Sequence, residues 1–116
     1  MTRVMLVENH DPFRQAIALI LEREPDFELV AQAGTLGEAR RLLAEREVDV
    51  AVVDLRLPDG DGTDLIQELK EANPPASVLV LSMSPGEAEE VGADGVLGKD
   101  ALFEEIIGTI RRLGNG

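Results

Sequence analysis

The chain alternates short apolar runs with longer segments in which apolar residues recur every three or four positions. Apolar runs between polar residues are typical of buried β-strands, and a spacing of three to four is typical of amphipathic α-helices. The runs predict five strands, at residues 4–7, 28–31, 48–53, 78–81 and 95–97. Helices are expected between and after them.

Four segments carry the helical spacing. Their apolar positions are Phe13, Ile17, Ile20 and Leu21; Leu36, Ala39, Leu42 and Leu43; Leu65, Ile66 and Leu69; and Phe103, Ile106, Ile107 and Ile110. Asp11 precedes Pro12, which is favoured as the first residue of a helix, and Thr35 and Glu38 have the spacing of a capping box. We therefore predict helices that begin at these two points.

The strand before Asp54, VDVAVV, and the strand before Ser82, SVLVL, are apolar almost throughout. Such continuous runs are typical of parallel strands that helices cover on both faces. Alternation of strands and helices then predicts an open α/β sheet, in which ligands bind outside the carboxyl ends of the strands.

Composition narrows the classes of function. The chain has 116 residues, 44% of them hydrophobic, which is enough for one domain over residues 1–116, so we expect no output domain in this chain. Three Phe and no Trp or Tyr disfavour ligands that need aromatic stacking. A net charge of −12 predicts that this domain alone binds neither nucleic acid nor membranes.

Residue types exclude some chemistry as well. The absence of Cys and the presence of a single His exclude thiolate chemistry and the usual zinc sites. No apolar stretch approaches the length that spans a membrane. These features lead us to expect a cytoplasmic protein.

Polar residues follow four of the predicted strands: Glu8 and Asn9, Asp54, Ser82, and Lys99. One polar residue after a strand is ordinarily the start of a solvated loop. As a set, however, they supply what phosphoryl transfer needs: a carboxylate nucleophile in Asp54, acidic oxygens for Mg²⁺, and a hydroxyl and an ammonium for phosphoryl oxygens.

The sequence also resembles the receiver domains of bacterial two-component response regulators, particularly those of the NarL/FixJ type. The resemblance runs from Arg3 to about Leu113, and its most specific pieces are LVENHDPFRQ, VDVAVVDLRLPDGDG, LVLSMS and GADGVLGKD. It implies a doubly wound (βα)5, flavodoxin-like three-layer sandwich with a five-stranded parallel sheet.

The resemblance also implies roles for the site residues. Asp54 would accept the phosphoryl group, and Ser82 and Lys99 would assist. Glu8 and Asn9 stand where the family has an acidic pair, and Mg²⁺ would be bound by this pair, by Asp54 and by the backbone carbonyl of Arg56. The implied partners are a sensor histidine kinase, a C-terminal helix-turn-helix output domain in a longer protein that regulates transcription, and a second copy of the chain on activation.

Three features depart from the family pattern. Asn9 replaces the acid that binds the metal directly, which we expect to weaken Mg²⁺ binding by about tenfold to a hundredfold. Val96 replaces an aromatic residue whose rotation signals phosphorylation in other members. The stretch between Ser82 and Lys99 is short by about one helical turn, so we expect a shortened fourth helix of about one turn over residues 87–91.

Two other hypotheses remain open at this point. The departures at Asn9, Val96 and the short fourth helix are compatible with an atypical receiver that binds a partner or ligand, or dimerises, without phosphorylation. The same Mg²⁺ chemistry could also serve a small phosphatase with an Asp nucleophile, although neither a general acid nor a substrate-capping segment is evident. We therefore expect no turnover enzyme beyond self-phosphorylation and dephosphorylation.

Overall fold

A computed structural model describes residues 1–87 and 92–115 and contains a five-stranded sheet in the order β2-β1-β3-β6-β7. Every pair of neighbouring strands is parallel. The strands are β1 (Thr2–Val7), β2 (Phe27–Ala33), β3 (Val50–Val53), β6 (Ser77–Ser82) and β7 (Gly95–Gly98). All five predicted strands are thus present.

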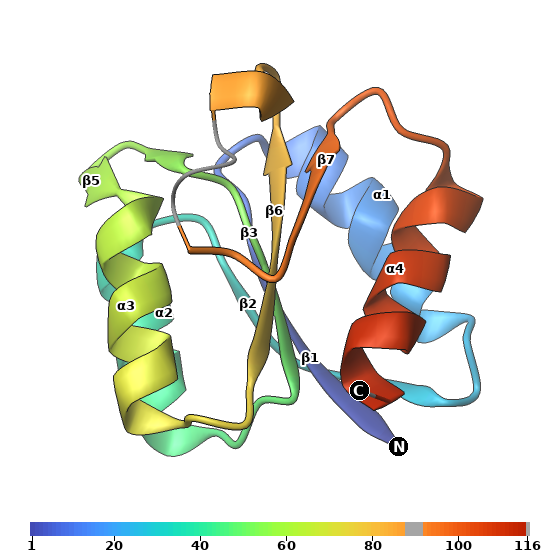
Figure 1. The fold of residues 1–116 in the computed structure, drawn as a ribbon, viewed down its shortest axis with the longest axis horizontal. Coiled ribbons are helices and arrows are strands. Elements are labelled where there is room, and N and C mark those ends of the chain that lie inside the picture. The colour runs from blue at the N-terminus through green and yellow to red at the C-terminus, as the bar shows by residue number, and fades with distance from the viewer. Residues whose placement is uncertain (88–91, 116) are drawn as a thin grey trace.

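Helices cover both faces of this sheet. They are α1 (Asp11–Glu22), α2 (Leu36–Glu45), α3 (Gly62–Ala72) and α4 (Phe103–Asn115). Helices α1 and α4 lie on one face, and α2 and α3 lie on the other (Figure 1). The predicted doubly wound three-layer fold is confirmed.

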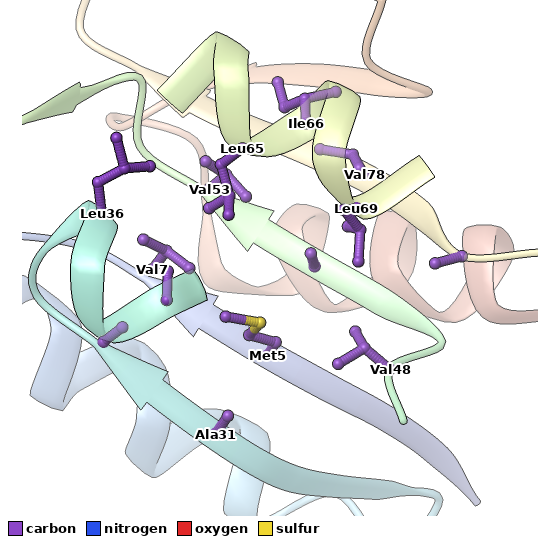
Figure 2. Packing of buried hydrophobic residues seen from close by; sticks show 14 of the residues in the cluster. Met5, Val7, Ala31, Leu36, Val48, Val53, Leu65, Ile66, Leu69 and Val78 are labelled. Atoms are coloured by element: carbon purple, nitrogen blue, oxygen red, sulfur yellow. The ribbon is translucent and has the colours of Figure 1, made fainter. Parts of the chain in front are cut away.

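Alternating side chains of each strand divide the core into two halves. In β1, Met5 and Val7 face α2 and α3, where they join Leu69 and its neighbours (Figure 2), whereas Val4 and Leu6 belong to the half under α1 and α4. All five side chains are at most 1% exposed. Because burying one such aliphatic side chain stabilises the fold by about 1.5–3 kcal/mol, both halves of the core contribute strongly.

The first two helices begin close to the predicted points. The first begins at Asp11, one residue earlier than we predicted, because His10 is its N-cap and accepts a hydrogen bond from the Phe13 N–H at 3.3 Å. The predicted N-cap of α2 at Thr35 is confirmed, since the Glu38 N–H donates to Thr35 Oγ1 at 3.1 Å. The Glu38 carboxylate completes the cap differently from a standard capping box, because it accepts from the Thr35 hydroxyl at 3.2 Å and from the Gly34 N–H at 3.4 Å.

Two details differ from the prediction. β3 begins at Val50 and not at residue 48, and the carbonyl of Val48 accepts a hydrogen bond from the side chain of Asn73 at 2.7 Å. A small antiparallel hairpin, β4 (Arg56–Leu57) with β5 (Gly60–Asp61), follows the third sheet strand. Strands of two residues carry no periodicity, so the sequence pattern did not predict the hairpin.

The shortened fourth helix is described only at its start. Residues Pro85–Glu87 form a single turn of 3₁₀ helix, and the rest of the predicted segment, residues 88–91, lies outside the described residues. Across residues 1–87 and 92–115, none of the helices combines the length and the apolar character needed to cross a membrane.

Candidate functional site

The candidate site lies at the carboxyl ends of β1 and β3, which are adjacent in the sheet. From β1 the chain continues to β2 on one side, and from β3 it continues to β6 on the other, so the strand order reverses between them (Figure 1). Open α/β sheets bind ligands at such a reversal. Glu8 directly follows β1 and Asp54 directly follows β3, so this topology places both carboxylates there.

Three charged side chains meet at this edge of the sheet. Lys99, which follows β7, places its ammonium 2.7 Å from Glu8 Oε1 and 3.2 Å from Asp54 Oδ2. The side chains are largely shielded from water, with exposed fractions of 16% for Lys99, 3% for Glu8 and 10% for Asp54. One cation therefore neutralises two buried carboxylates in part, which leaves the three groups with one net negative charge.

Burial and neighbouring charges shift the pKa values of Glu8 and Lys99. Burial raises the pKa of Glu8, the nearby charge of Asp54 adds to the rise, and the hydrogen bond from Lys99 only partly offsets it. Burial by itself lowers the pKa of Lys99, but its contacts with Glu8 and Asp54 outweigh that effect and raise the pKa. Lys99 therefore stays charged, and Glu8 takes up a proton more readily than an exposed glutamate.

Backbone groups hold the second oxygen of each carboxylate. The His10 N–H donates to Glu8 Oε2 at 3.0 Å, and the Arg56 N–H donates to Asp54 Oδ1 at 3.1 Å. Arg14 fastens the turn after β1, because its guanidinium donates to the Glu8 carbonyl at 2.8 Å. The two acids thus have fixed orientations before any ligand binds.

Ser82 ends β6 on the same edge. Its carbonyl accepts a hydrogen bond from the Lys99 N–H at 2.9 Å, which joins the ends of β6 and β7. Its hydroxyl accepts from the Ser84 N–H at 3.0 Å. A serine hydroxyl also has one hydrogen to donate, so Ser82 is suited to contact an anionic oxygen next to Lys99.

The donors at this edge fit a hard cation such as Mg²⁺. They are the carboxylates of Glu8 and Asp54, the exposed amide of Asn9 and the backbone carbonyl of Arg56, all of them oxygen ligands of the kind that Mg²⁺ prefers. Among the described residues, no three His, Cys, Asp or Glu side chains form a metal-binding group. Within the described part of the chain, the site therefore offers a metal the acidic side chains of Glu8 and Asp54, both already in contact with Lys99.

Gly62 shapes the loop that follows Asp54. A Cβ atom at this position would lie 2.7 Å from the carbonyl oxygen of Asp54 and 2.9 Å from the Cα of Leu55, so the close approach requires glycine. The Gly62 N–H also donates to the Leu55 carbonyl at 2.8 Å and closes the loop. The β4–β5 hairpin therefore begins and ends beside Asp54.

Three residues near the site were missed by the sequence analysis. Phe13 places its ring centre 5.4 Å from the Lys99 ammonium, Arg14 holds the Glu8 carbonyl, and Asp59 accepts hydrogen bonds from backbone N–H groups of α2. Phe13 and Lys99 also line an apolar groove of about 510 Å³ beside the site. Their roles depend mostly on contacts between different elements, which local patterns do not reveal.

Comparison with known proteins gives a consistent result. Residues 4–111 match the model of the response regulator receiver domain family. The DNA-binding transcriptional activator DevR/DosR of Mycobacterium tuberculosis is 31% identical over all of this chain and 56% of its own length. The chain spans about half the length of the first curated relatives it matches.

Solved structures agree in fold. The receiver domain of NarL from M. tuberculosis superposes with a TM-score of 0.88 at 27% identity, with coverage of 99% of this chain and 97% of that chain. A Burkholderia pseudomallei response regulator with a phosphorylated aspartic acid and a calcium ion superposes with a TM-score of 0.81 at 26% identity, with coverage of 99% and 69%. The chain belongs to the response regulator receiver domain family, among relatives of the NarL type.

Proposed function

We propose that residues 1–116 are the receiver domain of a transcriptional response regulator that accepts a phosphoryl group on Asp54 from the phosphohistidine of a sensor histidine kinase, with Mg²⁺ bound. The observation that carries this proposal is the arrangement of the Asp54 carboxylate, which is held at a strand end by the Arg56 N–H and lies 3.2 Å from the Lys99 ammonium.

The proposed reaction gives each of these residues a role. A carboxylate oxygen of Asp54 attacks phosphorus, the phosphorus–nitrogen bond of the phosphohistidine breaks, and its electron pair stays on the imidazole. The Lys99 ammonium would stabilise the negative charge on the oxygens of the transferred phosphoryl group, and the Ser82 hydroxyl would donate a hydrogen bond to one of these oxygens. Glu8, Asn9, Asp54 and the Arg56 carbonyl would hold Mg²⁺, which when bound would supply further positive charge for the phosphoryl oxygens.

Relatives support the partners in this proposal. The Burkholderia structure carries a phosphorylated aspartic acid and a calcium ion, and DevR/DosR is a DNA-binding activator about twice as long as this chain. A net charge of −12 disfavours DNA binding by the receiver itself, so we assign DNA binding to a helix-turn-helix output domain of a longer protein. Phosphorylation would then act by changing how the receiver pairs with a second copy.

The first experiment is an intact-mass measurement after incubation with acetyl phosphate, with and without Mg²⁺. We expect a phosphoryl adduct that requires Mg²⁺ and that is lost in Asp54→Ala. Asp64→Ala, which removes an exposed carboxylate on α3, is the matched control and should keep the adduct. An adduct that persists in Asp54→Ala would show that Asp54 is not the acceptor.

A second candidate function is favoured by Asn9 and Val96. Asn9 removes an acidic metal ligand, and Val96 packs partly buried against the core where other members carry an aromatic residue. These features suit a receiver that signals by binding a partner or a second copy without phosphorylation. In that case the folded chain would form no adduct at high Mg²⁺, and Asp54→Ala would leave its output unchanged.

A further inference from the structure

The tip of the β4–β5 hairpin is bonded to a helix that lies next to it. Both carboxylate oxygens of Asp59 accept hydrogen bonds from the start of α2, from the Leu36 N–H at 2.7 Å and from the Gly37 N–H at 2.9 Å. These two bonds lower the pKa of Asp59, so the carboxylate is ionised at neutral pH. The bonds connect segments that are 22 and 23 residues apart in the sequence.

This contact is more than an ordinary helix cap. The helix already has a local cap, since Thr35 Oγ1 accepts from the Glu38 N–H. Asp59 satisfies two further N–H groups of the same first turn from outside the helix. Next to it, Gly60 approaches the buried side chain of Leu36 so closely that a Cβ atom would lie 2.7 Å from Leu36 Cδ2. The hairpin tip is therefore bonded and packed onto the helix.

The same hairpin carries a backbone group of the candidate site. In its register, Arg56 pairs with Asp61, and Leu57 pairs with Gly60, which places Asp59 in the turn between the two strands. The Arg56 N–H holds Asp54 Oδ1, and the Arg56 carbonyl is one of the proposed metal ligands. Any rotation of the hairpin would therefore move that carbonyl relative to Asp54.

We propose that Asp59 is a positioning residue: by fixing the hairpin to the start of α2, it keeps the Arg56 carbonyl beside the Asp54 carboxylate and so strengthens Mg²⁺ binding. The inference rests on the proposed function of the site. Asp59 itself is neither a proposed metal ligand nor the proposed phosphoryl acceptor. Residues that orient metal ligands in this way typically contribute about tenfold to a hundredfold in metal affinity.

The test compares Asp59→Ala with two controls. Thr35→Ala weakens the N-terminal cap of α2 but leaves the hairpin residues unchanged. Asp64→Asn removes one negative charge, as Asp59→Ala does, but from an exposed position on α3. Asp59→Asn keeps one carbonyl oxygen and should recover part of the effect. All are measured without any phosphodonor, by NMR titration with Mg²⁺ and by hydrogen exchange of the Arg56 and Gly62 amides.

We expect Asp59→Ala to raise the Mg²⁺ dissociation constant by about tenfold and to accelerate exchange of the Arg56 amide, while both controls stay within about twofold of the unsubstituted chain. Unchanged affinity and exchange in Asp59→Ala would overturn the proposal, and so would an equal loss in Thr35→Ala. If the unsubstituted chain itself failed to bind Mg²⁺, the proposed metal site would be refuted, whereas the exchange rates would still decide whether Asp59 holds the loop.

Discussion

Replacing Asn9 by Asp tests how the charge of the site controls metal binding. The three charged groups at this edge, Glu8, Asp54 and Lys99, leave one net negative charge, and the Lys99 ammonium contacts both acids. Asn9 contributes an amide oxygen without charge. An added carboxylate at this position would double the net negative charge and give a cation a third acidic ligand, so Asn9→Asp should tighten Mg²⁺ binding.

The size of this gain in Mg²⁺ affinity depends on how exposed position 9 is and on the distance between the new charge and the ion. Two unit charges about 4 Å apart interact by roughly 1 kcal/mol in bulk water and by roughly 4 kcal/mol at an effective dielectric constant of about 20. Asn9 is exposed, which places the gain toward the lower figure, whereas the double charge of Mg²⁺ increases it. After part of the gain is lost to dehydration of the new carboxylate, we expect about 1.4–2.8 kcal/mol, which is about tenfold to a hundredfold in affinity.

NMR titration is the suitable assay, because the chain has no Trp or Tyr whose fluorescence could report binding. The amide signals of Asp54 and Arg56 should shift with Mg²⁺ at a lower concentration in Asn9→Asp than in the unsubstituted chain. Asn115→Asp is the matched control, since it adds the same charge at the end of α4. This position lies near the start of β1, at the end of the sheet opposite the site (Figure 1). Its titration should coincide with that of the unsubstituted chain.

Equal affinities in Asn9→Asp and the unsubstituted chain would refute the charge argument. A gain of the same size in Asn115→Asp would refute it in another way, because the effect would then reflect total charge and not the site. Repeating the titration at higher ionic strength adds a further check. Salt screens exposed charges over a Debye length of about 10 Å at 0.1 M, so the advantage of Asn9→Asp should shrink.

Three further predictions concern stability. Lys99→Met removes the cation shared by the two site carboxylates and should lower the free energy of unfolding at pH 7 by about 2–4 kcal/mol in urea denaturation, and no change would contradict the ion-pair geometry. Leu69→Ala, at a side chain only 1% exposed, should cost about 2–5 kcal/mol. Leu19→Ala, at a side chain 50% exposed, serves as its control and should cost less than about 0.5 kcal/mol in the same urea denaturation. The hydrogen bonds from Arg3 lower the pKa of Asp49, so the stabilisation is complete above the ordinary value of 3.8 and is lost as the pH falls below it. Asp49→Asn should therefore unfold at lower urea than the unsubstituted chain at pH 6, and an equal difference at pH 2 would contradict this assignment.

The fold was predictable because burial on both faces leaves a strong pattern in the sequence. Strands covered by helices on both sides are almost continuously apolar, as VAVV in β3 shows, so their existence was correctly predicted. Their ends depend on individual hydrogen bonds that no periodicity encodes, such as the bond from Asn73 to the Val48 carbonyl. The β4–β5 hairpin was not predicted either, because its strands have two residues each and so show no periodicity.

The site was predictable only in part. Parallel strands place their carboxyl ends on one edge, which was enough to expect Glu8, Asp54 and Lys99 near one another. The sequence could not show that Lys99 contacts both acids, because that depends on the register of β7 and on side-chain conformation. Asp59 gave no signal, since a PDG sequence is typical of any turn and its partners are on another element.

Asn9 has opposite effects on the two stages of the proposed reaction. Phosphorylation replaces one carboxylate charge on Asp54 by about two negative charges, so it adds about one negative charge to the site. With Mg²⁺ bound the site would carry one net positive charge, because the two charges of the ion add to the single net negative charge of Glu8, Asp54 and Lys99. The phosphorylated site would then be close to neutral. An acid at position 9 would strengthen metal binding but leave the phosphorylated site negative. We therefore expect Asn9→Asp to increase the yield of the acetyl phosphate adduct only at low Mg²⁺. At saturating Mg²⁺ the unsubstituted chain should give an equal or higher yield, and a lower one there would show that the amide at this position hinders phosphoryl transfer itself.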